Sequence, residues 1–228
     1  MARLSVAAVG VDACRKGWIA VTLREGAEVE AHYLSSISMI ADSIPDAQAI
    51  AIDMPIGLPH VGRRQAEVAA RAELGKRRNS VFFTPVRAAL GAANHASATA
   101  VSMALTGSGI SRQSYALREK IFEVEQWLPT APCGVWEVHP ELSFSILIGA
   151  PAHASKKTWA GMIERRNALL GAGIDLDPVL GAAADHAAID DMLDAGVAAW
   201  TARRLVRGVA RAFPAPPEVD ESGQAIWA

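Results

Sequence analysis

The sequence predicts an α/β fold built on a mixed five-stranded sheet, with three antiparallel strands followed by parallel strands and a large helical insertion. Short apolar runs bounded by turn residues recur between Val6 and Asp53, as they do in buried strands. The first three runs are joined by short turns, and a parallel return needs a dozen or more residues, so these three strands must be antiparallel. From Pro55 onward the pattern becomes mainly helical.

The three antiparallel strands come first in the chain. Residues 6–11 form a continuous apolar run, which is typical of a strand buried on both faces. The polar segment 15–17 predicts a turn into a second strand at 18–23. A break at 25–26 precedes a weaker third strand at 29–34. Together these segments predict an antiparallel meander.

The remaining elements extend the sheet and cover it. A short helix over 36–44 predicts a crossover, so the next strand, 47–52, should run parallel to an earlier one. We expect one domain spanning residues 1–228, with its helical insertion at about 55–130 and a fifth strand at 134–138. Three later helices are expected at about 141–148, 156–171 and 187–210.

Composition excludes several classes of protein. With 51% hydrophobic residues and a net charge of −2, the chain is not disordered. No apolar run reaches the ~18–20 residues that a bilayer helix needs, so we expect a cytoplasmic protein with no membrane partner. Cys14 and Cys133 lie far apart, which favours neither a disulfide framework nor a cysteine zinc site.

Two carboxylates fall at equivalent positions, because Asp12 ends the first apolar run and Asp53 ends the fourth. If those strands are parallel neighbours, both side chains emerge at the same edge of the sheet, where open α/β sheets bind ligands. Taken singly, each aspartate could merely open a turn. Taken together, they favour a functional site.

A third group of acids lies in the last predicted helix. On a helical wheel Asp190, Asp194 and Asp191 fall at about 0°, 40° and 100°, directly beside the apolar face. Like charges in one arc repel each other, and either the helix dipole or a bound metal could offset this repulsion. We expect a metal role for Asp191 first, and then for Asp194 or Asp190.

The predicted ligands are all carboxylates. Such an oxygen-rich site selects Mg²⁺ or Mn²⁺ over zinc, and two ions could promote phosphodiester hydrolysis. Glu137 ends the fifth strand and is a further catalytic candidate, with its role dependent on strand direction. Glu141 and His139 are more simply explained as structural residues.

Basic residues offer a place for phosphate. Seven basic residues and only two acidic residues stand between Arg63 and Arg87, and Arg77 and Arg78 lie at the centre of this patch. The patch could contact a phosphate backbone or simply be a solvated helix face. Lys156 and Lys157 are expected in the first turn of a helix, where the dipole disfavours cations unless they face an anion.

Specific strings carry a resemblance to a known family. They are VGVDACRKGWIAV at 9–21, IDMPIGLP at 52–59, GKRRNSVFFTPVR at 75–87, TGSGISRQSYAL at 106–117, EVHPELSF at 137–144, SKKTWAG at 155–161 and DDMLDA at 190–195. With these strings, over nearly its whole length, the chain resembles an uncharacterised bacterial family of predicted nucleases with an RNase H-like fold. It is more distantly similar to RuvC-type resolvases, which carry acids on the first and fourth strands and two more in the last helix.

The resemblance implies a metal-dependent nuclease. Asp12, Asp53, Asp191 and Asp194 match the resolvase positions, although Asp53 stands where resolvases usually have Glu. The implied reaction is hydrolysis of phosphodiester bonds in nucleic acid, with two Mg²⁺ or Mn²⁺ ions. Two alternatives remain open, namely a nucleotide phosphotransferase or phosphatase on the same fold, and a non-catalytic module that binds nucleic acid or protein.

Overall fold

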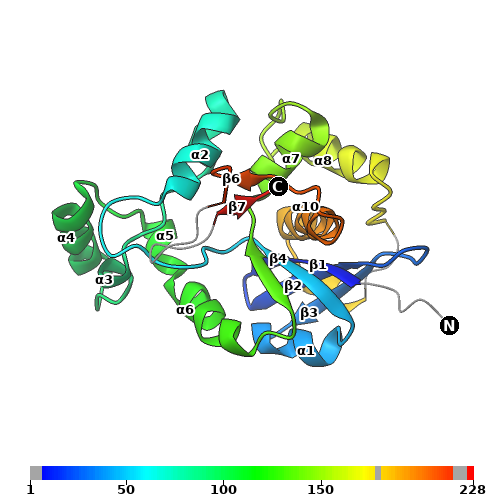
Figure 1. The fold of residues 1–228 in the computed structure, drawn as a ribbon, viewed down its shortest axis with the longest axis horizontal. Helices are drawn as coiled ribbons and strands as arrows, with labels where there is room; N and C mark the ends of the chain where they lie inside the picture. Colours follow the sequence, from blue (N-terminus) through cyan, green and yellow to red (C-terminus); the bar gives the residue numbers. More distant parts are fainter. Residues whose placement is uncertain (1–6, 178–180, 218–224) are drawn as a thin grey trace. The chain divides into compact units, whose positions relative to one another are not determined.

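The computed structural model describes residues 7–177, 181–217 and 225–228, so Val6 of the first expected strand lies outside the described residues. The predicted fold class is confirmed. A mixed five-stranded sheet has the order β3-β2-β1-β4-β5, and helices pack on it (Figure 1). Among the described residues, no helix combines the length and the apolar character needed to cross a membrane.

The strands pair as the short turns and the crossover predict. β1 is the central strand of the sheet, antiparallel to β2 and parallel to β4. At the two edges, β3 pairs antiparallel with β2 and β5 pairs parallel with β4. Their bounds are β1 Ala7–Cys14, β2 Gly17–Leu23, β3 Glu30–Leu34, β4 Ala47–Ile52 and β5 Gly134–Glu137. Nearly every residue of β1 and β2 is buried, which explains their continuous apolar sequences.

The long helix α10 (Ile189–Val206) lies against β1 and also packs on β2 and β4 (Figure 1). Its contact face is made of small residues, Ala195, Ala198, Ala199 and Ala202, all of which are fully buried. On the strand side, a Cβ added to Gly10 would lie 1.9 Å from the Ala199 nitrogen. Glycine is therefore required at position 10, because the helix backbone touches the strand backbone there.

Shorter helices complete this part of the molecule. α7 and α8 pack against α10, and α9 packs against β3. Phe144, Leu169 and Trp200 join side chains of β2 in a buried apolar core. The elements are η1 Ile37–Met39, α1 Ile40–Ser43, η3 Leu128–Thr130, α7 Pro140–Ile148, α8 Trp159–Gly171 and α9 Ala182–His186.

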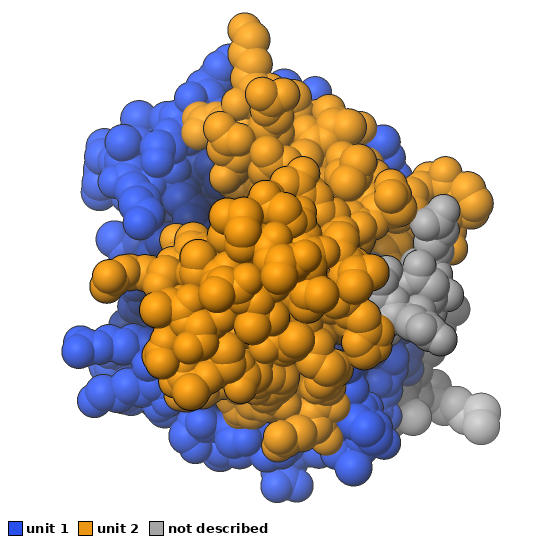
Figure 2. Space-filling view, turned by 90° about the vertical axis from the view of Figure 1, so that its left-hand side faces the viewer, with its two compact units in different colours: residues 1–53, 127–211, 227–228 blue, residues 54–126, 212–226 orange. Residues whose placement is uncertain are grey.

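The chain divides into two compact units. Unit 1 comprises 1–53, 127–211 and 227–228, and it contains the five-stranded sheet; unit 2 comprises 54–126 and 212–226 (Figure 2). Unit 2 is mainly helical, with α2 Gln65–Leu74, η2 Gly75–Ser80, α3 Arg87–Leu90, α4 His95–Thr106, α5 Arg112–Ala116 and α6 Arg118–Trp127. A small two-stranded sheet pairs β6 Ala212–Phe213 with β7 Ile226–Trp227.

Candidate active site

The carboxyl ends of β1 and β4 bring Asp12 and Asp53 together. Val11 pairs with Ile52 in the parallel register, and the Asp53 nitrogen donates a hydrogen bond of 2.9 Å to the Val11 oxygen. Asp12 and Asp53 are thus the next residues in register, and the pleat directs both side chains to the same face of the sheet. This is the face that Gly10 presents to α10.

Helix α10 supplies a third carboxylate from Asp194, which is only 1% exposed. The Nζ atom of Lys156 donates to Asp194 Oδ2 at 2.5 Å and lies 4.0 Å from Asp190 Oδ2. The ammonium of Lys156 also interacts electrostatically with Asp12 and Asp53. We call Asp12, Asp53, Asp194 and Lys156 the acidic cluster. It contains three carboxylates and one ammonium group.

The pKa values of the carboxylates in the acidic cluster are raised by burial, and those of Asp12 and Asp194 also by repulsion from neighbouring carboxylates. Burial, and then the negative charges of Asp53, Asp194 and Asp191, raise the pKa of Asp12 well above its usual value. Burial raises the pKa of Asp53 to about 6, and Lys156 opposes that rise. Burial likewise raises the pKa of Asp194 to about 6, even though it is ion-paired with Lys156. One ammonium group does not compensate for the burial of three carboxylates.

Lys156 and Asp194 differ in how fully their charges and polar atoms are compensated by neighbouring groups. Burial by itself lowers the pKa of Lys156, but the charges of Asp194, Asp53 and Asp12 outweigh it and hold this pKa above its usual value. Lys156 is therefore a permanent cation near neutral pH. Asp194 Oδ1, by contrast, is buried and has no hydrogen-bond partner among the described residues. A buried carboxylate oxygen without a partner is costly, so a donor or cation placed beside Asp194 Oδ1 would stabilise it.

The helix expected at 156–171 begins later, and this corrects the expected setting of its lysines. α8 starts at Trp159, and the Thr158 hydroxyl caps it by accepting a hydrogen bond from the Gly161 nitrogen at 3.2 Å. Threonine is a favoured N-cap, which explains the later start. Lys156 and Lys157 thus lie in the preceding turn and not in a helix. Lys156 faces carboxylates within the protein, whereas Lys157 is exposed.

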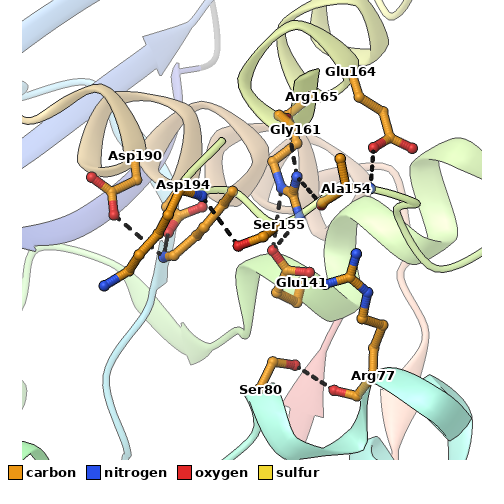
Figure 3. Close-up of polar contacts among 12 residues, drawn as sticks. Arg77, Ser80, Glu141, Ala154, Ser155, Gly161, Glu164, Arg165, Asp190 and Asp194 are labelled. Atoms are coloured by element: carbon orange, nitrogen blue, oxygen red, sulfur yellow. Dashed lines mark hydrogen bonds and ion pairs between the residues drawn. The ribbon is translucent and has the colours of Figure 1, made fainter. Parts of the chain in front are cut away.

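The loop that carries Lys156 is held rigidly against α8 (Figure 3). The Arg165 guanidinium, fully buried, donates to the Ala154 oxygen at 3.1 Å and pairs with Glu141 at 2.5 Å. Both oxygens of Glu164 accept backbone hydrogen bonds from residues 153 and 154. A Cβ at Gly161 would lie 2.0 Å from the Ser155 oxygen, so only glycine allows the loop to approach this closely. These contacts hold in place the backbone from which the Lys156 side chain extends.

The other two acids of α10 are placed less deeply than Asp194. Asp191 Oδ2 accepts a hydrogen bond of 3.0 Å from the Ala188 nitrogen, and Asp191 thereby caps its own helix. Burial raises the pKa of Asp191, and the capping bond opposes that rise. Asp190 is half-buried at the edge, within reach of Lys156. Asp194 is the most deeply buried of the three acids of α10, while Asp191 lies near enough for its charge to raise the pKa of Asp12.

Glu137 does not join the acidic cluster. It pairs in register with Ile52, one residue before Asp53, and alternating side chains point to opposite faces of a sheet. Val138 is the residue level with Asp53, and it packs with Ala198 and Ala202 of α10. Glu137 is buried, and its position places it on the opposite face from Asp12 and Asp53.

The expected nucleic-acid-binding arginines belong to unit 2. Arg77 and Arg78 lie in η2, a 3-10 helix, where Arg78 is exposed and Arg77 is half-buried. The Arg78 oxygen accepts a hydrogen bond of 2.9 Å from the Arg71 guanidinium. Part of the basic patch therefore has a structural role, because Arg71 binds the backbone of η2.

The donor set of the acidic cluster suits a hard divalent cation. Carboxylate oxygens are the ligands that Mg²⁺ and Mn²⁺ prefer, and Asp194 Oδ1 is an unpartnered buried oxygen. In the described part of the chain, however, no three His, Cys, Asp or Glu side chains converge on a point that could hold a metal ion. The positive charge within reach of the carboxylates comes from Lys156.

Sequence reasoning missed two features of this site. It did not pair Lys156 with Asp194, because the two residues are far apart in the chain and only tertiary packing brings them together. It also did not rank the acids of α10 by depth. On the helical wheel Asp190 falls nearest the apolar face, yet Asp190 is half-buried and Asp194 is buried, so the wheel alone does not predict the order.

Comparison with known proteins adds a family but no activity. A family model described as "Protein of unknown function (DUF429)" matches residues 10–219, so the chain belongs to this family. No curated protein and no solved structure matches the chain.

Proposed function

We propose that the acidic cluster is the catalytic centre of a metal-dependent phosphodiester hydrolase acting on nucleic acid. The proposal rests on the site, because membership of a family of unknown function assigns no activity. One observation carries the proposal. Asp12, Asp53 and Asp194 are brought together with raised pKa values, share one ammonium group and leave Asp194 Oδ1 unpartnered. Strongly perturbed pKa values at the carboxyl edge of an α/β sheet are typical of functional sites.

Each residue of the acidic cluster has a proposed part. Asp12, Asp53 and Asp194 would hold one or two Mg²⁺ or Mn²⁺ ions, with Asp191 at the margin. A divalent ion supplies an activated water and stabilises charge on the phosphate. The backbones of β1, β4 and α10 set the positions of the carboxylates without the help of an ion. The resemblance to RuvC-type resolvases, which use acids at these positions, supports the same assignment.

Lys156 is central to the proposal because its ammonium group occupies Asp194 Oδ2, one of the oxygens that would hold the metal. With a metal held there, Lys156 would no longer be needed as the counter-charge of Asp194. Released but still tethered by its rigid loop, Lys156 would be available to a phosphate oxygen of the substrate. Lys157, Arg77 and Arg78 are proposed to give salt-sensitive contacts to the phosphate backbone.

The test combines metal binding with cleavage. Mn²⁺ and Mg²⁺ are titrated calorimetrically, and a panel of DNA, RNA, hybrid and branched substrates is incubated with each ion. The protein should bind the ion and cut at least one substrate, while Asp53→Asn should lose both properties. Asp185→Asn is the matched control, since it removes an exposed carboxylate from α9 and should change neither. Cleavage by Asp53→Asn at the parental rate would refute the proposal.

A second candidate function rests on the ion pair itself. The Lys156–Asp194 pair and the lack of three converging ligands in the described residues suit a non-catalytic binding module that keeps its acids for structure. Such a module would bind nucleic acid or protein equally well with and without divalent ions. Absence of ion binding in the titration would favour this candidate.

A further inference from the structure

Unit 2 contains a pocket of its own, with a volume of about 200 Å³. Its walls come from the segment at 62–63, from the segment at 82–85 and from the end of α4 through the start of α5. The second and third wall segments overlap the sequence strings GKRRNSVFFTPVR and TGSGISRQSYAL. The proposed hydrolase function gives this pocket no role. Known ligand pockets mostly measure ~300–1,000 Å³, so this one suits a small ligand.

The pocket is positively charged. Arg63 is the only charged residue of its lining, all of which lies within the described residues. The guanidinium carbon of Arg63 lies 4.1 Å from the centre of the Phe83 ring, and that of Arg71 lies 4.8 Å from it. The neighbouring carboxylate, Glu67, is neutralised by Arg64 in a buried pair. Within the described residues Arg63 has its side-chain hydrogen bond to Ser108 and no carboxylate partner, so its charge is available to a ligand.

Hydroxyl groups supply further hydrogen-bond donors. The Ser108 hydroxyl accepts a hydrogen bond of 3.2 Å from Arg63, so its own proton is directed elsewhere. The Ser111 and Ser114 hydroxyls share one hydrogen bond of 2.8 Å, and Ser111 Oγ also accepts from the Ser114 nitrogen at 2.9 Å. These bonds use only one of the two hydroxyl protons. The pocket therefore offers several N–H and O–H donors and no carboxylate acceptor.

We propose that this pocket binds the phosphate group of a small phosphomonoester, with Arg63, Ser108 and the Ser111–Ser114 pair as donors. A guanidinium with neighbouring hydroxyls matches the oxygens of a phosphate dianion. Phe82, which lines the pocket and is 37% exposed, offers its ring to a flat group carried by the same molecule. A nucleoside monophosphate has both features.

The experiment is a calorimetric titration without divalent ions, using AMP, ribose 5-phosphate, inorganic phosphate and adenosine as probes. AMP should bind most tightly, ribose 5-phosphate and inorganic phosphate more weakly, and adenosine should not bind detectably. Arg63→Gln should weaken AMP binding about tenfold or more, as expected for a lost charge-assisted contact. Phe82→Ala should reduce AMP to the affinity of ribose 5-phosphate.

Two controls make the result specific. Arg112→Gln removes the same charge from an exposed residue next to Ser111 that does not line the pocket, and it should cost less than about threefold. The Asp53→Asn variant should bind AMP like the parent, which separates this pocket from the acidic cluster. Equal losses in Arg63→Gln and Arg112→Gln would overturn the proposal. So would equal binding of inorganic phosphate and AMP, or binding of an oligonucleotide but not of AMP.

Discussion

Two buried groups of charges lie close together in unit 1, and they are built in opposite ways. Arg165 and Glu141 form a balanced pair, in which the guanidinium donates to one carboxylate and to the Ala154 and Gly161 oxygens. The acidic cluster sets three carboxylates against the ammonium of Lys156 and leaves Asp194 Oδ1 without a partner. Both groups meet at the loop that carries Lys156.

The difference separates charges that hold the structure from charges that are available to a ligand. A fully satisfied buried pair contributes to stability only as long as both members are present. An unbalanced cluster costs stability in the free protein and recovers it when a cation binds. Four experiments test this contrast, and removal of Arg165 should have the largest effect.

Arg165→Met should destabilise the protein by about 3–5 kcal/mol, because it leaves Glu141 buried without its counter-charge. Urea unfolding followed by circular dichroism measures the loss. Arg166→Met is the matched control, since the pair of Arg166 with Asp177 is exposed, and its effect should be far smaller. Equal effects in the two variants would show that the Arg165 pair is not a structural anchor.

Lys156→Met should destabilise the protein by roughly 2 kcal/mol at pH 7, since three buried carboxylates lose their cation. Unlike the loss in Arg165→Met, this loss should be largely restored by millimolar Mg²⁺ or at pH 5, where the carboxylates take up protons. Unfolding curves under the three conditions provide the comparison. A loss that neither Mg²⁺ nor acid restores would place Lys156 among the structural charges.

The pH dependence of stability should expose the carboxylates directly. Asp53 and Asp194 have folded pKa values of about 6, whereas an unfolded aspartate titrates near ~3.9. Between these values the folded state binds more protons than the unfolded state, so the free energy of unfolding falls as pH rises from about 4 to 6 and changes little above pH 6. The curve of the parent minus that of Asp53→Asn isolates this contribution. If the Asp53 contribution to stability instead increased between pH 4 and pH 6, the raised pKa of Asp53 would be contradicted.

Asp12→Asn should give the smallest effect and the opposite sign. Removing one repelling carboxylate should stabilise the metal-free protein by ~1 kcal/mol, and it should abolish the rise in melting temperature that we expect Mg²⁺ to cause in the parent. Differential scanning fluorimetry with and without Mg²⁺ measures both. An unchanged Mg²⁺ response in this variant would remove Asp12 from the proposed metal site.

Much of the architecture followed from local pattern. Apolar runs and short turns predicted the strands, and the aspartates that end two of these runs indicated one edge of the sheet. The side of the sheet was harder to predict, because it depends on register. A shift of one residue places Glu137 level with Ile52 and not with Asp53. Lys156 was misplaced because a hydroxyl cap, and not helix propensity, determines where α8 begins.

The contact between Gly10 and α10 gives the site a mechanical property. Backbone touches backbone there, so no flexible side chain lies between strand and helix to absorb a displacement. Asp12 follows two residues after this contact, and Asp194 directly precedes Ala195, whose oxygen forms part of it. Their mutual repulsion therefore cannot relax by parting the two elements. The contact is stiff, and a cation bound beside these carboxylates would reduce a repulsion that the backbone cannot relieve by moving.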